Sequence, residues 1–157
     1  MDNLKYTFDQ VNEWIRTADQ KAMILGSFNM AGFIYQLINI DKIICAGIYT
    51  IVLFAISIII TIVSLIFWLL IIWPRLDNKL KISKIYFLHI ANAYENDKNT
   101  GIEDLQKISD VEFRKDLASQ IVENSAIAKR KYKYIQKFIL LFIVQLITLL
   151  LLLVSVV

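Results

Sequence analysis

The stretch WIRTADQKAMILGSFNMAG, residues 14 to 32, begins as a charged amphipathic segment and becomes apolar with no turn signal between its two parts. Upstream of it, an apolar residue recurs every three or four positions, at Leu4, Phe8, Val11, Ile15, Ala18 and Ala22. This spacing is typical of one face of an α-helix. The sequence therefore predicts an amphipathic helix over residues 1–21 that runs without a break into an apolar segment.

Three stretches of the chain contain no charged residue: 22–40, 43–73 and 138–157. About 20 apolar residues cross the hydrocarbon core of a bilayer, so the second and third are long enough to span it. As one helix the second would measure on the order of 46 Å, and it would have to tilt or project from the membrane. We expect three transmembrane helices over these ranges.

The first of these stretches is unusually polar for a membrane span. It contains Ser27, Asn29, Gln36 and Asn39. Polar groups at membrane depth need partners, so this helix is expected to pack against protein.

The overall composition agrees with an all-α membrane protein. Hydrophobic residues make up 57% of the chain, more than the 45–50% usual in soluble domains. One proline and four glycines are too few for a turn-rich β architecture. The N-terminus is acidic as well as basic and does not resemble a signal peptide.

Basic residues predict how the chain lies in the membrane. Thirteen of the 17 lysines and arginines fall within residues 75–137, and three precede residue 22. The positive-inside rule then places the N-terminus and residues 75–137 on the cytoplasmic side of the membrane, with the Asp41–Lys42 turn outside.

Residues 75–137 are predicted to form a small helical cytoplasmic module between the second and third spans. Helical spacing predicts one helix over 83–96. Two capping-box patterns, TGIE with Thr100 as N-cap and SDVE with Ser109 as N-cap, predict a short helix over 101–107 and a long one over 110–157. The long helix would measure about 70 Å and include the last span.

The sequence offers no enzymatic motif. Phosphate-binding glycine loops, zinc-protease motifs and nucleophile elbows are all absent, and no His or Cys cluster has metal-ligand spacing. We expect neither catalysis nor a metal. The basic run KRKYKYIQK, residues 129–137, fits binding of anionic lipid headgroups, or alternatively a phosphate site with tyrosines that stack on a base. One short patch is weak support for nucleic-acid binding, which we do not expect.

Asp19 is the unusual member of the charged group at the start of the first apolar segment. Long basic side chains such as those of Arg16 and Lys21 can reach water from a membrane edge, whereas an aspartate is short and is repelled by an acidic leaflet. Two interpretations remain open: a local ion pair with Arg16, three residues away, or a partner on another helix.

Several short stretches, taken in order, resemble the transmembrane effectors of bacterial Pycsar antiphage defence. They are ADQKA (18–22), PR (74–75), IYFLHIA (85–91), DLASQI (116–121) and AIAKRKY (126–132). Each is short, but their order, spacing and hydropathy match over nearly the whole chain. The resemblance implies an effector that senses a cyclic pyrimidine mononucleotide, cyclic CMP or cyclic UMP, made by a partner cyclase, and that impairs the bacterial inner membrane. A subunit with three spans has too few to enclose a pore alone, so we also expect a homo-oligomer.

The resemblance and the residue chemistry together suggest a nucleotide site in the cytoplasmic helices. Lysines would neutralise the cyclic phosphate, a tyrosine would stack on the base and an amide would read its edge, while Asp19 and Arg16 would hold the helix packing. His89 is included, although a lone histidine is more typical of a helix–helix contact than of a ligand site. The predicted binding residues are Lys21, Tyr86, His89, Gln120, Asn124, Lys129, Lys131 and Tyr132.

Two other functions stay open. The chain could be an adaptor whose cytoplasmic helices recruit a protein partner, or a small oligomeric channel. No ionisable residue lies inside the three apolar stretches, which argues against an ion relay. An oligomeric pore lined by Ser57, Thr61, Ser64 or Gln145 would still be compatible with the sequence.

Overall fold

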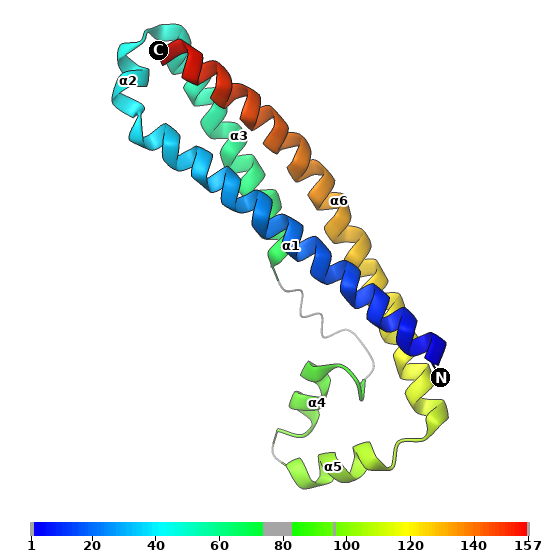
Figure 1. Cartoon of the computed structure of the whole chain (residues 1–157). Helices are drawn as coiled ribbons and strands as arrows, with labels where there is room; N and C mark the ends of the chain where they lie inside the picture. Colours follow the sequence, from blue (N-terminus) through cyan, green and yellow to red (C-terminus); the bar gives the residue numbers. More distant parts are fainter. Residues whose placement is uncertain (1, 74–82, 96, 157) are drawn as a thin grey trace. The chain divides into compact units, whose positions relative to one another are not determined.

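A computed structural model describes residues 2–73, 83–95 and 97–156 (Figure 1). Within these ranges the chain is all helical, with α1 (Asp2–Ile38), α2 (Ile40–Cys45), α3 (Ile48–Ile72), α4 (Phe87–Ala93), α5 (Lys98–Gln106) and α6 (Asp110–Val156). The chain divides into a first unit, Met1–Ile15 with Pro74–Lys129, and a second unit, Arg16–Trp73 with Arg130–Val157. Helices α1 and α6 contribute residues to both units.

The two long helices follow the sequence prediction closely. Helix α1 passes through Ala22 without a break, as the missing turn signal predicted. Helix α6 begins at Asp110 behind the predicted capping box: the Glu112 amide donates to Ser109 Oγ at 3.3 Å, and the Ser109 amide donates to Glu112 Oε2 at 3.5 Å.

The predicted second span, 43–73, is divided in the structure. The break falls after Ala46, at Gly47, whose φ of +114° is rare for residues with a side chain. Asp41 and Lys42, predicted as a turn, lie instead within the short helix α2. The long helix α3 therefore covers Ile48–Ile72 and is shorter than the charge-free run suggests.

The two short helices also differ from their predicted ranges. Helix α4 begins at Phe87 rather than 83, because the Ser83 hydroxyl accepts the amides of Ile85 and Tyr86 and forms a turn there. Helix α5 is capped by Asp97, not by Thr100. The Asp97 carboxylate accepts the amides of Asn99 and Thr100 at 3.1 and 3.2 Å, and the Thr100 hydroxyl at 2.6 Å.

Two helices are long and apolar enough to cross a membrane, Ile48–Ile72 and Asp110–Ser155. Only 22% of the most apolar window of each is buried, whereas the core helix of a soluble protein would be mostly buried. Residues 22–40, the predicted first span, do not add a third such helix among the residues described. Their amide side chains lower the hydropathy, so the three-span topology stays a prediction.

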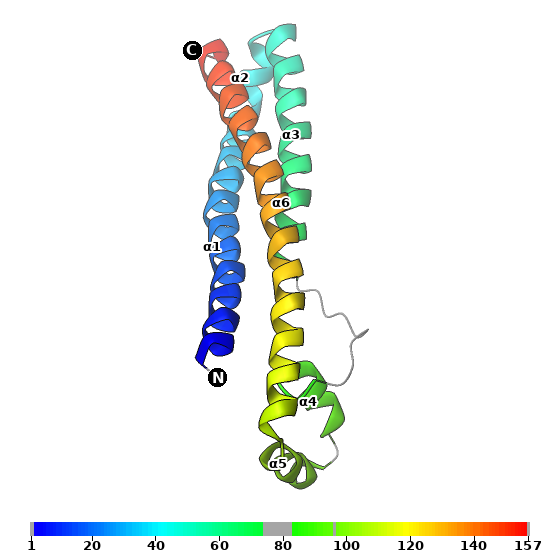
Figure 2. The same ribbon diagram turned by 90° about the vertical axis from the view of Figure 1, so that its right-hand side faces the viewer.

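In the second unit, α1, α3 and α6 run side by side (Figures 1 and 2). One part of their shared interior is apolar and comprises Ala18, Ala22, Ile71, Ile135 and Phe138. We call these five residues the apolar cluster. Trp68 packs against it, and its indole Nε1 donates to the Ala22 carbonyl at 3.0 Å. Gly26 makes room for this indole, because a Cβ there would overlap it.

Another part of that interior is polar, and we call it the polar seam. Its side chains are all buried and come from the three helices: Asn29 and Gln36 from α1, Thr50, Ser57, Thr61 and Ser64 from α3, Gln145 and Thr148 from α6. Asn29 Nδ2 donates to Ser64 Oγ at 2.7 Å, and Gln36 Nε2 donates to Ser57 Oγ at 3.0 Å. The predicted need of Asn29 and Gln36 for protein partners is thus confirmed.

Candidate functional site

The predicted binding residues belong to two different units. Lys21, Lys131 and Tyr132 lie in the second unit together with Arg16 and Asp19. The first unit contains Tyr86, Gln120, Asn124 and Lys129. The backbone of His89 belongs to α4, but its side chain lies outside the described part of the chain.

Asp19 pairs across helices in the second unit. Lys131 Nζ of α6 donates to Asp19 Oδ1 of α1, and the two side chains are 15% and 33% exposed respectively. Of the two interpretations left open by the sequence, this contact matches a partner on another helix. Because Asp19 already neutralises Lys131, an incoming phosphate would have to compete with the carboxylate for this ammonium group.

Two other basic side chains of this region, those of Lys21 and Lys137, lie over aromatic rings. Lys21 Nζ is 5.8 Å from the centroid of the Tyr132 ring, and Lys137 Nζ is 5.4 Å from that of Phe67. Both distances are within the range of a cation–π interaction. Phe67 in turn contacts Tyr134, with ring centroids 6.2 Å apart. Within the basic run, Lys131 and Lys137 therefore contact side chains of α1 and α3, whereas Arg130 and Lys133 are exposed.

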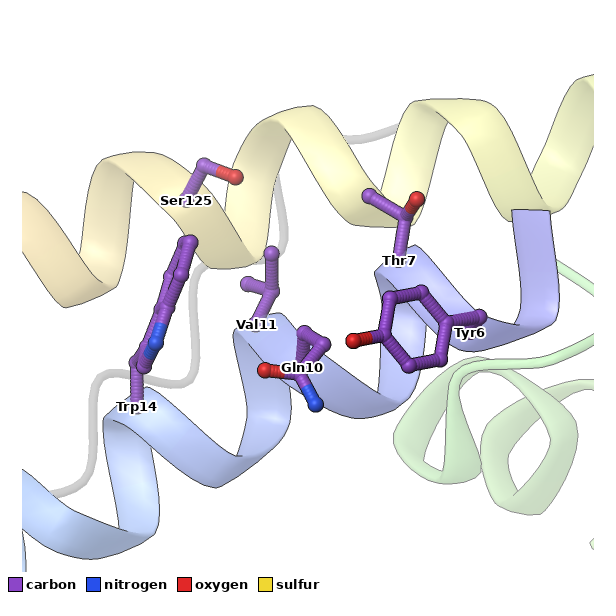
Figure 3. A pocket seen from close by; sticks show the side chains of 6 residues that line it. All are labelled: Tyr6, Thr7, Gln10, Val11, Trp14 and Ser125. Atoms are coloured by element: carbon purple, nitrogen blue, oxygen red, sulfur yellow. The ribbon is translucent and has the colours of Figure 1, made fainter. Parts of the chain in front are cut away.

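The first unit contains a cavity of about 400 Å³ (Figure 3). Tyr6, Thr7, Gln10, Val11 and Trp14 of α1 line it, together with Ser125 of α6. Val11 is buried, whereas Tyr6 is 66% exposed and Trp14 is 52% exposed. The cavity thus has an apolar floor and two accessible aromatic faces, and its volume falls in the range of small-molecule sites.

An amide pair joins α1 and α6 beside this cavity. Asn124 Nδ2 donates to Asn12 Oδ1 at 2.9 Å, and Asn124 directly precedes the cavity residue Ser125. Gln120, one helical turn before Asn124, is buried. Of the two residues predicted to read the base edge, Asn124 thus joins α1 to α6, and Gln120 is buried in the protein.

One lysine is positioned to extend the cavity. Lys129 is exposed and lies four residues after Ser125, which places the two residues on the same face of α6. Together the site offers aromatic faces, hydroxyl and amide groups, and a cation one turn away. This combination suits a flat heterocycle with an anionic substituent.

The sequence analysis missed Tyr6 and Trp14. A signal was available, because Tyr6, Gln10 and Trp14 recur every four residues and form their own face of α1 beside the apolar stripe. Tyr86, predicted to stack on a base, is half-buried, and its amide donates to Ser83 Oγ at 3.0 Å. Tyr86 does not line the cavity.

Comparison with known proteins gives one family. A family model described as Pycsar effector protein domain (PycTM) matches residues 3–157. No curated protein and no solved structure matches the chain.

Proposed function

The chain belongs to the Pycsar effector family, and from this premise we propose that it binds cyclic CMP or cyclic UMP in its first unit and then impairs the membrane. Family membership makes the chain an antiphage membrane effector, to which a partner cyclase supplies a cyclic nucleotide signal. The family is known for membrane disruption and not for catalysis. The ligand, its site and the response are our proposals.

The observation that carries the nucleotide proposal is the aromatic cavity of the first unit. A pyrimidine ring would stack on Trp14 or Tyr6, since every base has a π-face that aromatic side chains can cover. Gln10 and the hydroxyl groups of Thr7 and Ser125 supply donors and acceptors for the base edge or the ribose. Lys129 would neutralise the cyclic phosphate.

We propose further that α1 is the first of three membrane spans. On this helix Ile24, Phe28, Ile34 and Ile38 are at least half exposed, whereas Asn29 and Gln36 are buried. Apolar side chains outside and amides inside are expected of a helix whose outer face meets lipid. The positive-inside rule supports a cytoplasmic N-terminus and a cytoplasmic module in the bacterial inner membrane, and we expect a homo-oligomer.

An adaptor function is the alternative that an observation favours. In the first unit Val111 is 77% exposed, Val122 is 69% exposed and Ile102 is 56% exposed. Apolar side chains on a polar helical module could contact a soluble protein partner. The nucleotide experiment below separates the two functions.

The test is ligand binding by the full chain in detergent, measured by isothermal titration calorimetry with cyclic CMP, cyclic UMP, cyclic AMP and cyclic GMP. We expect one pyrimidine nucleotide to bind and the purine nucleotides to bind weakly or not at all. Trp14→Ala should weaken binding roughly five- to 150-fold, the loss that corresponds to about 1–3 kcal/mol of base stacking.

Trp73→Ala is the matched control, since Trp73 is 69% exposed and lies outside the cavity and the first unit. Binding that is equal in the two variants would reject the cavity as the nucleotide site. Absence of binding by all four nucleotides to the wild-type chain would reject the sensor function and favour the adaptor.

A further inference from the structure

The interior of the second unit contains a hydrogen-bonded node that joins three helices. Gln36 Nε2 of α1 donates to Ser57 Oγ of α3 at 3.0 Å, and Gln145 Nε2 of α6 donates to the same oxygen at 3.3 Å. The Thr148 hydroxyl lies 3.2 Å from it. The two lone pairs of the Ser57 oxygen accept the two amides, and its one proton can bond to Thr148 Oγ1, whose own proton bonds to the Gln145 carbonyl at 2.9 Å. This arrangement uses the whole hydrogen-bonding capacity of the Ser57 hydroxyl.

Three amide oxygens of the polar seam are left over. Asn29 Oδ1, Gln36 Oε1 and Gln145 Oε1 accept no hydrogen bond from the described residues, although the three side chains are at most 1% exposed. Rotation of an amide group by 180° does not help, because it would leave the NH₂ group without a partner instead. Each oxygen needs a donor that the described residues do not supply, and water is the smallest one.

The seam has a definite length along α3. Ser64 lies 14 residues after Thr50, so the hydroxyl side chains of the seam extend over about 21 Å at 1.5 Å per residue. Ile71 of the apolar cluster lies seven residues, or about 10 Å, further along. Together the two lengths match the hydrocarbon thickness of about 30 Å.

We propose that the polar seam of each subunit holds water, and that the apolar cluster is the hydrophobic gate which closes this path at one end. Separation of Phe138 and Ile135 from Ala18, Ala22 and Ile71 would join the seam to the water beyond the gate. The path lies within one subunit, among α1, α3 and α6, and not between subunits. This inference rests on the proposed three-span topology but not on nucleotide binding.

Cysteine accessibility tests the proposal in reconstituted phosphatidylcholine and phosphatidylglycerol vesicles. Cys45 is exposed and would react, so the experiment uses a Cys45→Ser background. Ser57→Cys and Thr61→Cys place a thiol in the seam, and Ile59→Cys places one on the outer face of the same helix, where Ile59 is 62% exposed. A small charged methanethiosulfonate reagent modifies thiolates, which form in water and not in an apolar environment.

We expect both seam cysteines to react at least about tenfold faster than the cysteine at position 59, because only the seam gives the thiol access to water. Two seam variants are used because Ser57→Cys removes the hydroxyl that joins the three helices, whereas Thr61→Cys leaves it in place. Seam cysteines as unreactive as position 59 would overturn the proposal by showing a dry interior. Fast reaction of the cysteine at position 59 would also overturn the proposal, by showing that this face of α3 is not covered by lipid. Both outcomes are independent of the result of the nucleotide-binding experiment.

Discussion

The two units differ in the amount of polar side chain that they bury, although α1 and α6 contribute to both and the second unit also contains the apolar cluster. The first unit buries Val11, Leu117 and Ala128, as a water-soluble domain would. The second unit buries amides such as Asn29 and Gln36 and exposes isoleucines and leucines along the same helices. The helical period is the same in both, so this difference reports a change of solvent and not a change of secondary structure.

The difference in buried polar side chains also changes what each interior requires. An apolar interior is stabilised by the removal of surface from water, which needs no specific partners. A polar interior surrounded by lipid gains little from burial, and its stability depends on hydrogen bonds and close packing. Equivalent substitutions should therefore have different effects in the two units.

The largest expected difference concerns a charge at an exposed apolar position. Ile59→Lys in the second unit should lower both the membrane-inserted fraction and the stability, because a lysine near the centre of a transmembrane helix costs about 2.5–3.5 kcal/mol. Val122→Lys in the first unit should change stability by less than about 0.5 kcal/mol, because that side chain is 69% exposed on a polar module. The measurement is the membrane-inserted fraction and thermal stability of each variant. Equal tolerance of both lysines would contradict this difference between the units.

The next difference concerns ion pairs. Asp19→Asn should destabilise the second unit by about 1–2 kcal/mol, less than a fully buried pair, because Asp19 is 33% exposed. If the Asp19–Lys131 ion pair couples α1 to α6, the Asp19→Asn variant should also lose its toxicity in cells while it still inserts into the membrane. Glu103→Gln removes the equivalent charge from the Lys107–Glu103 pair of the first unit, whose side chains are about 70% exposed, and should have almost no effect.

A charge reversal separates pairing from a simple loss of charge. The double variant Asp19→Lys with Lys131→Asp should recover part of the stability and toxicity that each single reversal loses. Thermal unfolding and growth assays on all four chains give the coupling between the two residues. If the losses of stability and toxicity in the two single reversals simply add in the double variant, Asp19 is not coupled to Lys131.

A smaller difference is expected for serine hydroxyls. Ser57→Ala leaves the Nε2 groups of Gln36 and Gln145 without an acceptor and should cost about 1 kcal/mol, in line with hydrogen bonds in other membrane bundles. Ser125→Ala in the first unit removes only a bond to the Ile121 carbonyl of its own helix and should stay within about 0.5 kcal/mol. Thermal unfolding of the two variants in the same detergent makes the comparison. Equal losses of stability in the two variants would indicate that the hydrogen bonds to Ser57 contribute no more than the single bond of Ser125.

Local sequence signals predicted the long helices well and their interruptions poorly. The Ser109–Glu112 capping box and the periodicity before Ala22 each depend on neighbours within four residues, so the sequence contains the whole signal. The break at Gly47 was not predicted, because an uncharged run of 31 residues is typical of one membrane helix. The nearby charged residues at 41–42 indicated a turn there instead.

The candidate sites depend on contacts that no local pattern encodes. The unusual position of Asp19 indicated an interhelical partner, but its pairing with Lys131 joins residues 112 positions apart and follows only from the tertiary packing. Tyr6 and Trp14 were not predicted, because the apolar stripe that indicates a core lies on the neighbouring face of α1. The orphaned amide oxygens could not be predicted at all, since their lack of a donor is a property of the assembled interior.

The smallest effect, and the last test of the contrast, is a pH response confined to the first unit. Hydrogen bonds from the Thr100 hydroxyl, and then from the amides of Thr100 and Asn99, hold the pKa of Asp97 below its usual 3.8, against a small opposing effect of desolvation. Because the pKa is lower in the folded chain than in the unfolded one, the ionised cap stabilises α5 above about pH 4, and this stabilisation is lost as the pH falls through the lowered value.

Amide hydrogen exchange at Asn99 and Thr100, corrected for the intrinsic effect of pH, should therefore show less protection at pH 3 than at pH 6. Asp97→Asn keeps a capping side chain without a titratable group, and its protection should not change over this range. The apolar stretches of the second unit contain no Asp, Glu, Lys, Arg or His, so amides such as those of Ser57 and Thr61 should keep their protection in both chains. Loss of protection there at pH 3 would mean that the interior of the second unit responds to acid through groups outside its apolar stretches, and that the two units are not independent.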